Sequence, residues 1–300
     1  MTIACCYVSP EGVILGADST ASYGGAGGMR HYNHNQKIFE IGRDGTMGIV
    51  TWGLGSLGAV SYRTLIARLA DDVAARGDLP VADVMDLWIA SYWAEYCSYL
   101  SSGQNGAYIA AARALSAKLP HDPTTPIDPA RRSAAEEQTL RQILSGYTAG
   151  FCIGGYALPD RTPCAFFVMF DPLSSAPPTA TALTMGYEFW GAPNIFQRLI
   201  NGADEATKAA IVSSSHWSGT DADLNAVLAP HSLGHPAIPL RDAIDFVYMC
   251  IYSTIKAIKF SGFPRVCGGP IELAVISSDR PYRWVRHKAW DAAVAEGAAS

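Results

Sequence analysis

The chain has 300 residues, of which 49% are hydrophobic and 16% charged, so it can bury a large core without help from disulfides or metals. Its net charge of −5, and the lack of Lys or Arg clusters interleaved with aromatic residues, argue against a nucleic-acid partner. The seven cysteines are odd in number and never spaced as CxxC, which indicates free thiols in a cytoplasmic protein.

The first fifty residues have the pattern of paired strands. Residues 3–8 and 13–17 flank a turn at Pro10-Glu11-Gly12, and residues 37–41 and 47–52 form a second predicted hairpin. From about Ser56 the hydrophobic period becomes helical, and a second helix follows Pro80 and ends near Leu100. Two helices therefore follow four strands.

The rest of the chain repeats this order. Residues 101–146 contain two helical pieces joined by a proline-spaced linker, which we interpret as an insertion, and residues 213–238 form a second insertion. Strands are predicted at 148–156, 163–170, 179–185, 271–277 and 282–285, and helices at 192–200, 205–212 and 241–259. Such segregated runs indicate a single α+β domain over residues 1–300, with two antiparallel sheets covered by helices.

The last of these helices is the most apolar segment. Its apolar part, residues 246–255, is about half the length that a bilayer requires and is flanked by Asp245 and Lys256. It predicts a buried helix, and neither a membrane span nor a secretory signal is expected.

Thr2 is the first residue with a chemical interpretation. Removal of Met1 would place a free α-amine and a β-hydroxyl on one residue, so that a nucleophile carries its own base. Many chains have Thr second, so Thr2 needs supporting residues.

Asp18 and Lys37 give that support. Asp18 ends the second predicted strand, where the hairpin returns to the start of the chain, and Lys37 opens the third strand in an otherwise apolar segment. A buried Lys–Asp pair can place a cation beside Thr2 and lower the pKa of its hydroxyl or amine. Gly53 ends the fourth strand, where a free backbone N–H could form an oxyanion hole.

Taken in order, Thr2, Gly-Ala-Asp18-Ser-Thr, Lys37-Ile-Phe and Trp52-Gly53 resemble the proteasome β-subunit family of N-terminal-nucleophile (Ntn) hydrolases, which includes the bacterial ancestral-β-subunit (Anbu) proteins. Weaker similarity continues at Gly154-Gly155 and Cys267-Gly268-Gly269. The resemblance implies a four-layer αββα sandwich with Thr2 as nucleophile, Asp18 paired with Lys37, and Gly53 N–H as oxyanion donor. It also implies contacts of Ser22 and Thr51 with a bound peptide.

Two positions depart from the family pattern. Active members carry an Asp and a Ser three residues apart before the late glycines, where this chain has Pro264 and Cys267. A further family Ser has no counterpart in residues 186–191 other than the hydroxyl of Tyr187. The network around the amine is therefore altered.

Competing motifs are weaker. Gly53-Leu-Gly55-Ser-Leu-Gly58 matches GxGxxG, but helix follows helix where a dinucleotide fold needs a second strand. The pairs His31/His34 and His231/His235 lack a third ligand, so neither a metal nor a cofactor is expected. A nucleophile at Cys5 or Cys6 would require loss of most of the first strand.

The leading hypothesis is amide hydrolysis of a peptide through an acyl-enzyme on Thr2. The alternatives are a weakly active or inactive assembly protein on the same fold, and a hydrolase of small amides whose pocket the two insertions close. The resemblance further implies a homo-oligomer, as a ring or helical stack, and leaves room for an unidentified ATPase partner.

Overall fold

The N-terminal hairpin is the centre of the first sheet. The computed structural model describes residues 2–25, 28–42, 44–121, 128–234, 238–262 and 267–288. Strands β1 (Ile3–Ser9) and β2 (Gly12–Ala17) are buried along their whole length, as expected for strands covered on both faces. The sheet has the order β12-β1-β2-β13-β14, with β12 at Gly186–Gly191, β13 at Glu272–Ser277 and β14 at Arg280–Arg286.

The second sheet has the order β11-β10-β9-β6-β5, and its neighbouring strands are antiparallel. Its strands are β5 (Ile38–Ile41), β6 (Met47–Gly53), β9 (Ala149–Gly155), β10 (Cys164–Phe170) and β11 (Thr181–Ala182). Buried side chains from both sheets, among them Ala4, Cys6, Val50 and Cys152, form one apolar cluster, so the sheets face each other. Trp52 of β6 stacks on Trp190 of β12 with ring centroids 4.3 Å apart.

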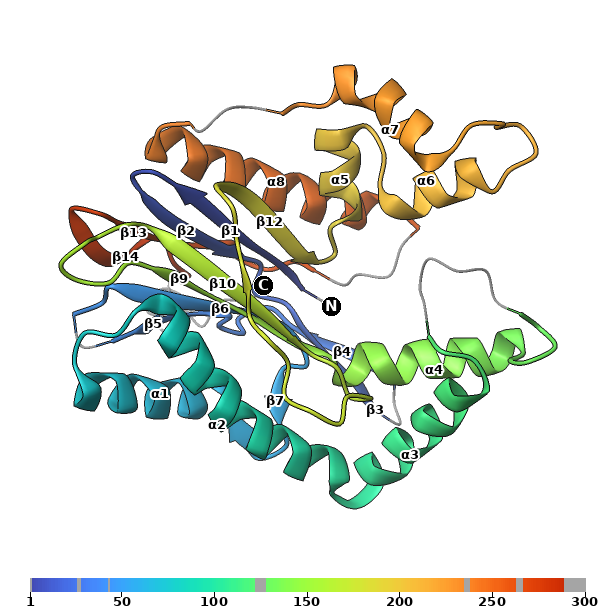
Figure 1. Cartoon of the computed structure of the whole chain (residues 1–300), viewed down its shortest axis with the longest axis horizontal. Helices are drawn as coiled ribbons and strands as arrows, with labels where there is room; N and C mark the ends of the chain where they lie inside the picture. The colour runs from blue at the N-terminus through green and yellow to red at the C-terminus, as the bar shows by residue number, and fades with distance from the viewer. Residues whose placement is uncertain are drawn as a thin grey trace, which may run out of the picture.

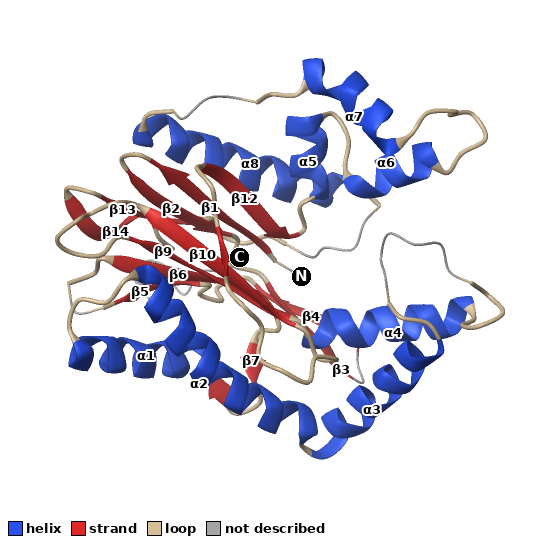
Figure 2. Cartoon of the chain, viewed as in Figure 1, coloured by secondary structure: helices blue, strands red, loops and turns tan. Residues whose placement is uncertain are grey.

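Helices cover the outer face of each sheet (Figures 1 and 2). Helices α1 (Tyr62–Arg76) and α2 (Val81–Ser101) bury residues such as Leu65 and Trp88 against Phe151 of the second sheet. Helices α5 (Asn194–Asn201) and α8 (Leu240–Phe260) bury Phe196 and Val247 on the first sheet. The fold is therefore α+β, with helices outside two antiparallel sheets.

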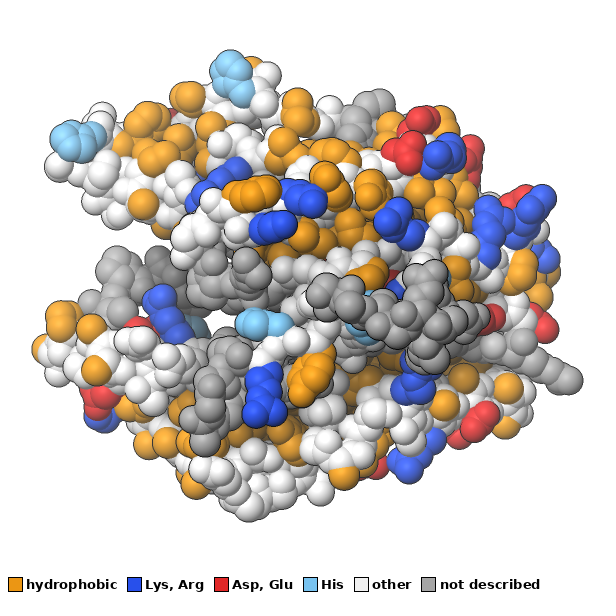
Figure 3. Space-filling model, turned by 180° about the vertical axis from the view of Figure 1, so that it is seen from behind, with side chains coloured by type: hydrophobic (Ala, Val, Ile, Leu, Met, Phe, Trp, Pro, Cys, Tyr) orange, Lys and Arg blue, Asp and Glu red, His pale blue; other side chains and the backbone are white. Residues whose placement is uncertain are grey.

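Further helices extend from one end of the molecule. Helices α3 (Gly103–Lys118) and α4 (Ala134–Tyr147) contact each other, and α6 (Glu205–Val212) and α7 (Asp221–Leu228) precede a 3₁₀ turn at Ala229–His231. The surface is hollowed between these two groups (Figure 3). In Figure 1, β1 begins on the side of the molecule that faces them. On the back of the molecule, Lys and Arg side chains stand among hydrophobic and uncharged ones (Figure 3).

The structure corrects the predicted elements around residues 179–191. Only Thr181–Ala182 of the expected strand 179–185 is a strand, whereas residues 186–191, which lie between that strand and the helix predicted at 192–200, form β12. The reason is that β12 pairs with β1 over its full length, from Gly186 opposite Val8 to Gly191 opposite Ile3. A long-range pairing of this kind leaves little local signal in the sequence.

Two short hairpins were not predicted. Strands β3 (Ala21–Gly25) and β4 (Gly28–Tyr32) pair after Asp18. Strands β7 (Ser56–Leu57) and β8 (Val60–Ser61) lie where the first helix was expected to begin. That helix instead begins at Tyr62, because the side chain of Ser61 caps it by accepting a hydrogen bond from Thr64 N.

Candidate active site

Asp18 lies at the centre of the site, one residue after β2, and is fully buried. Its Oδ1 accepts hydrogen bonds from Ile3 N at 3.1 Å and from Lys37 Nζ at 2.5 Å. Its Oδ2 accepts from Thr20 N at 3.2 Å and from Gly268 N at 2.8 Å. Each oxygen therefore has two donors, which is the environment that stabilises an ionised carboxylate.

Lys37 immediately precedes β5 and is 3% exposed. Its Nζ donates to Asp18 Oδ1 and also to Thr20 O at 2.6 Å. Burial lowers the pKa of Lys37, and the negative charge of Asp18 acts in the opposite direction. The predicted pair is thus formed, and it joins one sheet to the other.

Thr2 directly precedes β1 and is buried, with 5% exposure. The next residue, Ile3, donates its N–H to Asp18 and accepts a hydrogen bond from Asp18 N at 3.1 Å. On the other side, Gly191 has φ +88°, and a Cβ there would lie 1.8 Å from Thr2 O. The backbone of Thr2 is therefore held between Asp18 and a close approach that only glycine permits. Met1 lies outside the described residues.

Gly53 ends β6 with φ +81°, and a Cβ there would lie 2.3 Å from Thr148 O. The backbone of Thr148 lies so close that only glycine fits at position 53, whether or not Gly53 has a catalytic role. The preceding residue, Trp52, stacks on Trp190, which directly precedes Gly191. The stack thus connects the strand that carries Gly53 to the strand beside Thr2.

Thr51 and Ser22 occupy different surroundings. Thr51 N donates to Lys37 O at 3.0 Å, so its backbone fixes the start of β5, and its buried hydroxyl has no hydrogen-bond partner among the described residues. Ser22 lies in β3, is half-buried, and its Oγ is 2.9 Å from His31 Nδ1. Thr51 is thus brought beside Lys37, whereas the contacts of Ser22 lie within the β3–β4 hairpin.

Sequence reasoning missed the roles of Thr20 and Gly268. Thr20 supplies the second acceptor for Lys37, and its hydroxyl donates to Asn33 Oδ1 at 3.0 Å. Gly268 supplies an N–H to Asp18 and a carbonyl to Ser19 N at 3.0 Å. Both residues belong to the motifs that carried the family resemblance. Their contacts with Asp18 and Lys37 use backbone atoms, however, and the sequence does not reveal backbone contacts because every residue type can make them.

Cys267 is buried next to this network. Burial raises the pKa of its thiol to about 12, with the charge of Asp18 acting in the same direction. The thiol is therefore neutral, and a thiol donates only a weak hydrogen bond. Tyr187 lies opposite Tyr7 in the sheet and packs in the apolar cluster under α8, five residues along β1 from Thr2. Pro264 lies outside the described residues.

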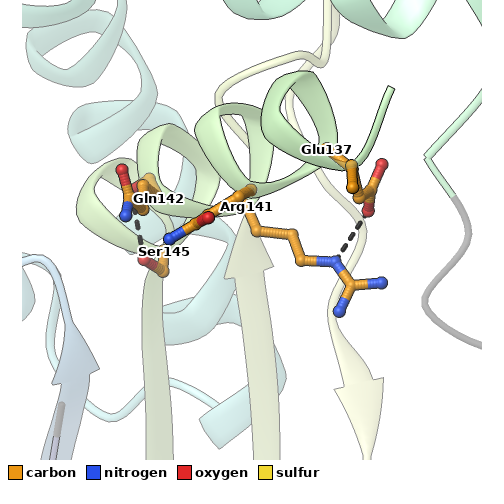
Figure 4. Close-up of a pocket in the computed structure, with 6 residues that line it drawn as sticks. Glu137, Arg141, Gln142 and Ser145 are labelled. Carbon is orange, nitrogen blue, oxygen red and sulfur yellow. Dashed lines mark hydrogen bonds and ion pairs between the residues drawn. The ribbon is translucent and has the colours of Figure 1, made fainter. Parts of the chain in front are cut away.

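Other constellations in the described residues have structural explanations. A pocket on the outer face of α4 is lined by Ala134, Glu137, Gln138, Arg141, Gln142 and Ser145 (Figure 4). Glu137 there is neutralised by Arg132 at 2.6 Å and by Arg141 at 2.7 Å, and Arg132 also binds the carbonyl of Leu115 at 3.1 Å. This cluster joins α3 to α4.

The structure also shows where the histidine pairs and the GxGxxG motif lie. Within the described ranges, no three His, Cys, Asp or Glu side chains are grouped as metal ligands would be, and His235 falls outside those ranges. Of the glycines of GxGxxG, Gly53 ends β6, Gly55 lies between β6 and β7, and Gly58 lies in the β7–β8 turn. In the part of the chain that the structure describes, helices are too short or too polar to cross a bilayer.

No family model and no curated protein matches the chain. Among solved structures, Anbu (ancestral beta-subunit) from Yersinia bercovieri is similar with a TM-score of 0.50 and 8% identity, over 96% of this chain and 88% of that one. Anbu from Hyphomicrobium sp. strain MC1 has a TM-score of 0.48 and 10% identity, covering 98% and 93%. A Gly-1 mutant of Anbu from the same Hyphomicrobium strain has a TM-score of 0.49 and 12% identity, over 97% of this chain and 89% of that one.

The similarity to the Yersinia protein extends over nearly the whole chain. It concerns the fold, since 8% identity carries no residue roles. The buried Asp18–Lys37 pair beside the start of β1 is observed independently, in this chain itself. The chain has an Anbu-like, proteasome-related Ntn fold.

Proposed function

We propose that this protein is an N-terminal threonine hydrolase of amide bonds, with Thr2 as the nucleophile once Met1 has been removed. The observation that carries the proposal is the shared acceptor Asp18 Oδ1, which binds both Lys37 Nζ and the N–H of the residue after Thr2. Because one carboxylate oxygen binds both the backbone at the start of β1 and the ammonium group of Lys37, the two are held close together. Such pre-organisation is what a nucleophile requires.

The proposed reaction proceeds through an acyl-enzyme. Thr2 Oγ attacks the substrate carbonyl, its proton passes to the α-amine of Thr2 or to Lys37, and Gly53 N–H binds the oxyanion. The amine of the leaving group takes up a proton, and water then hydrolyses the ester. Asp18 keeps Lys37 in place, and Ser22 and Thr51 belong to the proposed peptide-binding surface.

The architecture supports a substrate that enters from one end. We assign the four-layer αββα arrangement to a single Ntn-hydrolase domain over residues 1–300. The helical additions at 101–146 and 213–238 would flank the hollow between the two groups of helices (Figure 3). The substrate is a peptide or a small amide, and the protein acts in the cytoplasm as a homo-oligomer.

A catalytically weak assembly protein is the second candidate. The observation that favours it is the neutral, buried Cys267 thiol at the position where the family resemblance implies a Ser. A thiol orients a neighbouring amine less strongly than a hydroxyl does, which would slow proton transfer.

Intact mass and covalent labelling separate these candidates. Wild-type protein treated with an epoxyketone probe should gain the mass of one probe on Thr2, after loss of Met1. Thr2→Ala should retain its fold by circular dichroism and gain no mass. Equal labelling of both proteins would show that Thr2 is not the nucleophile, and retained Met1 would favour the assembly role.

A further inference from the structure

A second buried ion pair lies close to the first. Glu272 in β13 is fully buried, and Lys288, two residues after β14, is 6% exposed. Lys288 Nζ is 3.2 Å from Glu272 Oε1, and His287 Nε2 is 3.4 Å from the same oxygen. Two buried residues of opposite charge at one end of the sandwich require an explanation.

Strand register places Glu272 next to the candidate active site. Glu272 lies opposite Ala17, the residue before Asp18. Along β13, Leu273 packs in the cluster under α8 and Ala274 in the cluster between the sheets. Because side chains alternate along a strand, the Glu272 side chain is on the face toward the second sheet, which carries Lys37.

The charges of the two pairs act on each other. The charge of Glu272 raises the pKa of Lys37, in the same sense as Asp18, against the larger effect of burial, which lowers it. Burial lowers the pKa of Lys288, and repulsion from Lys37 acts in the same direction. Asp18, Lys37, Glu272 and Lys288 thus form one buried network of two carboxylates and two ammonium groups.

The Glu272–Lys288 pair has fewer hydrogen bonds than a pair that serves mainly to stabilise the fold would have. In the described part of the chain, Glu272 Oε1 is approached by Lys288 Nζ at 3.2 Å and by His287 Nε2 at 3.4 Å, whereas Glu272 Oε2 has no hydrogen-bond partner. Asp18, by contrast, has two donors on each oxygen. A buried carboxylate with few hydrogen bonds adds little to stability, because its desolvation offsets its attraction to a partner.

We propose that Glu272 is a positioning residue for the N-terminal nucleophile, whose carboxylate together with Asp18 balances the charge of Lys37 beside Thr2, and that Lys288 holds the Glu272 side chain in place. The inference rests on the proposed function, in which Lys37 lies beside Thr2. It deepens that function by making Lys37 an electrostatic stabiliser, so that the α-amine of Thr2 is the base. The residues that end the described chain thereby contribute to the site.

Other groups around the network are accounted for. Asp18, Cys267 and Glu272 face Lys37, and Glu272, Lys37 and, from α1, Arg63 face Lys288. His287 also lies beside Glu272, and the charge of Glu272 acts on Tyr282 of β14, whose pKa is raised mainly by burial. The Cys267 thiol is neutral below its pKa of about 12. Glu272→Gln therefore removes one negative charge from the groups that face Lys37 and leaves the others in place.

The test is the titration of Lys37 in the full-length protein. The chain has six lysines, so 13C NMR of protein labelled at lysine Cε is tractable, and Lys37→Arg assigns the signal. Glu272→Gln, which is nearly isosteric, should lower the pKa of Lys37 by about 1 unit. Asp204→Asn is the matched control, because Asp204 is equally buried but caps α6, and it should leave the signal unchanged.

Labelling kinetics connect the titration to the site. In Glu272→Gln, the alkaline limb of the pH profile of epoxyketone labelling should move down by the same amount as the Lys37 titration. Lys288→Met should reduce the labelling rate about tenfold only while Glu272 is present, so Glu272→Gln/Lys288→Met should label at the same rate as Glu272→Gln alone.

The outcomes separate the inference from the function on which it rests. An unchanged Lys37 titration in folded Glu272→Gln would overturn the inference, even if that variant had a lower melting temperature. A shifted titration in a protein that no probe labels would support the charge coupling and contradict the proposed hydrolase instead.

Discussion

Replacing Asp18 by Asn tests whether the Asp18–Lys37 pair is the structural centre of the site. The variant keeps the shape of the side chain but removes its charge, and leaves Lys37, which is 3% exposed, without a counter-ion at 2.5 Å. Breaking a buried pair in this way costs about 3–5 kcal/mol. We expect that loss in urea unfolding at pH 7, and no probe labelling at Thr2.

The variant also has a characteristic pH dependence. Burial already lowers the pKa of Lys37 in the folded protein, and loss of Asp18 lowers it further. The unfolded chain then binds more protons than the folded one between the lowered folded pKa and the ordinary value of Lys. The free energy of unfolding of Asp18→Asn should therefore rise with pH in that window, more steeply than that of the wild type.

Two controls define the result that would refute this reasoning. Asp245→Asn removes an exposed partner of Arg241 and should change stability by less than about 0.5 kcal/mol. Asp18→Asn/Lys37→Met should be more stable than Asp18→Asn alone, because it removes the uncompensated cation. A cost for Asp18→Asn as small as that of Asp245→Asn, or a double variant less stable than the single one, would contradict the interpretation.

Two further predictions concern the surroundings of Thr2. Gly191→Ala puts a Cβ at 1.8 Å from Thr2 O, so Thr2 must move, and labelling should fall about 100-fold. Gly146→Ala in α4, where the Cβ meets nothing within 4 Å and the backbone is helical, should label at a rate near that of the wild type. Since burial raises the pKa of Cys267 to about 12, iodoacetamide at pH 8 should modify the exposed Cys97 and leave Cys267 unmodified, as measured by peptide mass spectrometry. Rapid alkylation of Cys267 in the folded protein would show that its environment is more open.

Local patterns account for most of the elements that the sequence predicts. The hairpin of β1 and β2 was predicted from β-branched runs around a turn, and the helix Glu205–Val212 was predicted with its observed bounds. The helix at Asp221–Leu228 was missed, although Thr220 and Asp223 form a capping box that reads directly from the sequence. Strand β12 was missed because its main partner, β1, lies more than 170 residues earlier in the chain.

The part of the candidate site that is formed by side chains could be predicted from the sequence, whereas the part formed by backbone atoms could not. Lys37 is an unusual residue in an apolar strand segment, Asp18 is a common residue at a strand end, and the structure brings them together as the family resemblance implied. The contributions of Thr20 and Gly268 come from backbone atoms, which any residue possesses. Glu272 and Lys288 read as ordinary charged residues in the sequence, since only the fold shows that both are buried.

The donors around Asp18 also bear on the order of events during synthesis. Lys37 reaches Asp18 only when the two sheets close on each other, and Gly268 N comes from a residue 250 positions further along the chain. A nascent chain that has made β1 and β2 therefore carries Thr2 without its electrostatic surroundings. On the proposed function, the surroundings of the nucleophile would therefore be completed only with the last strands of the chain.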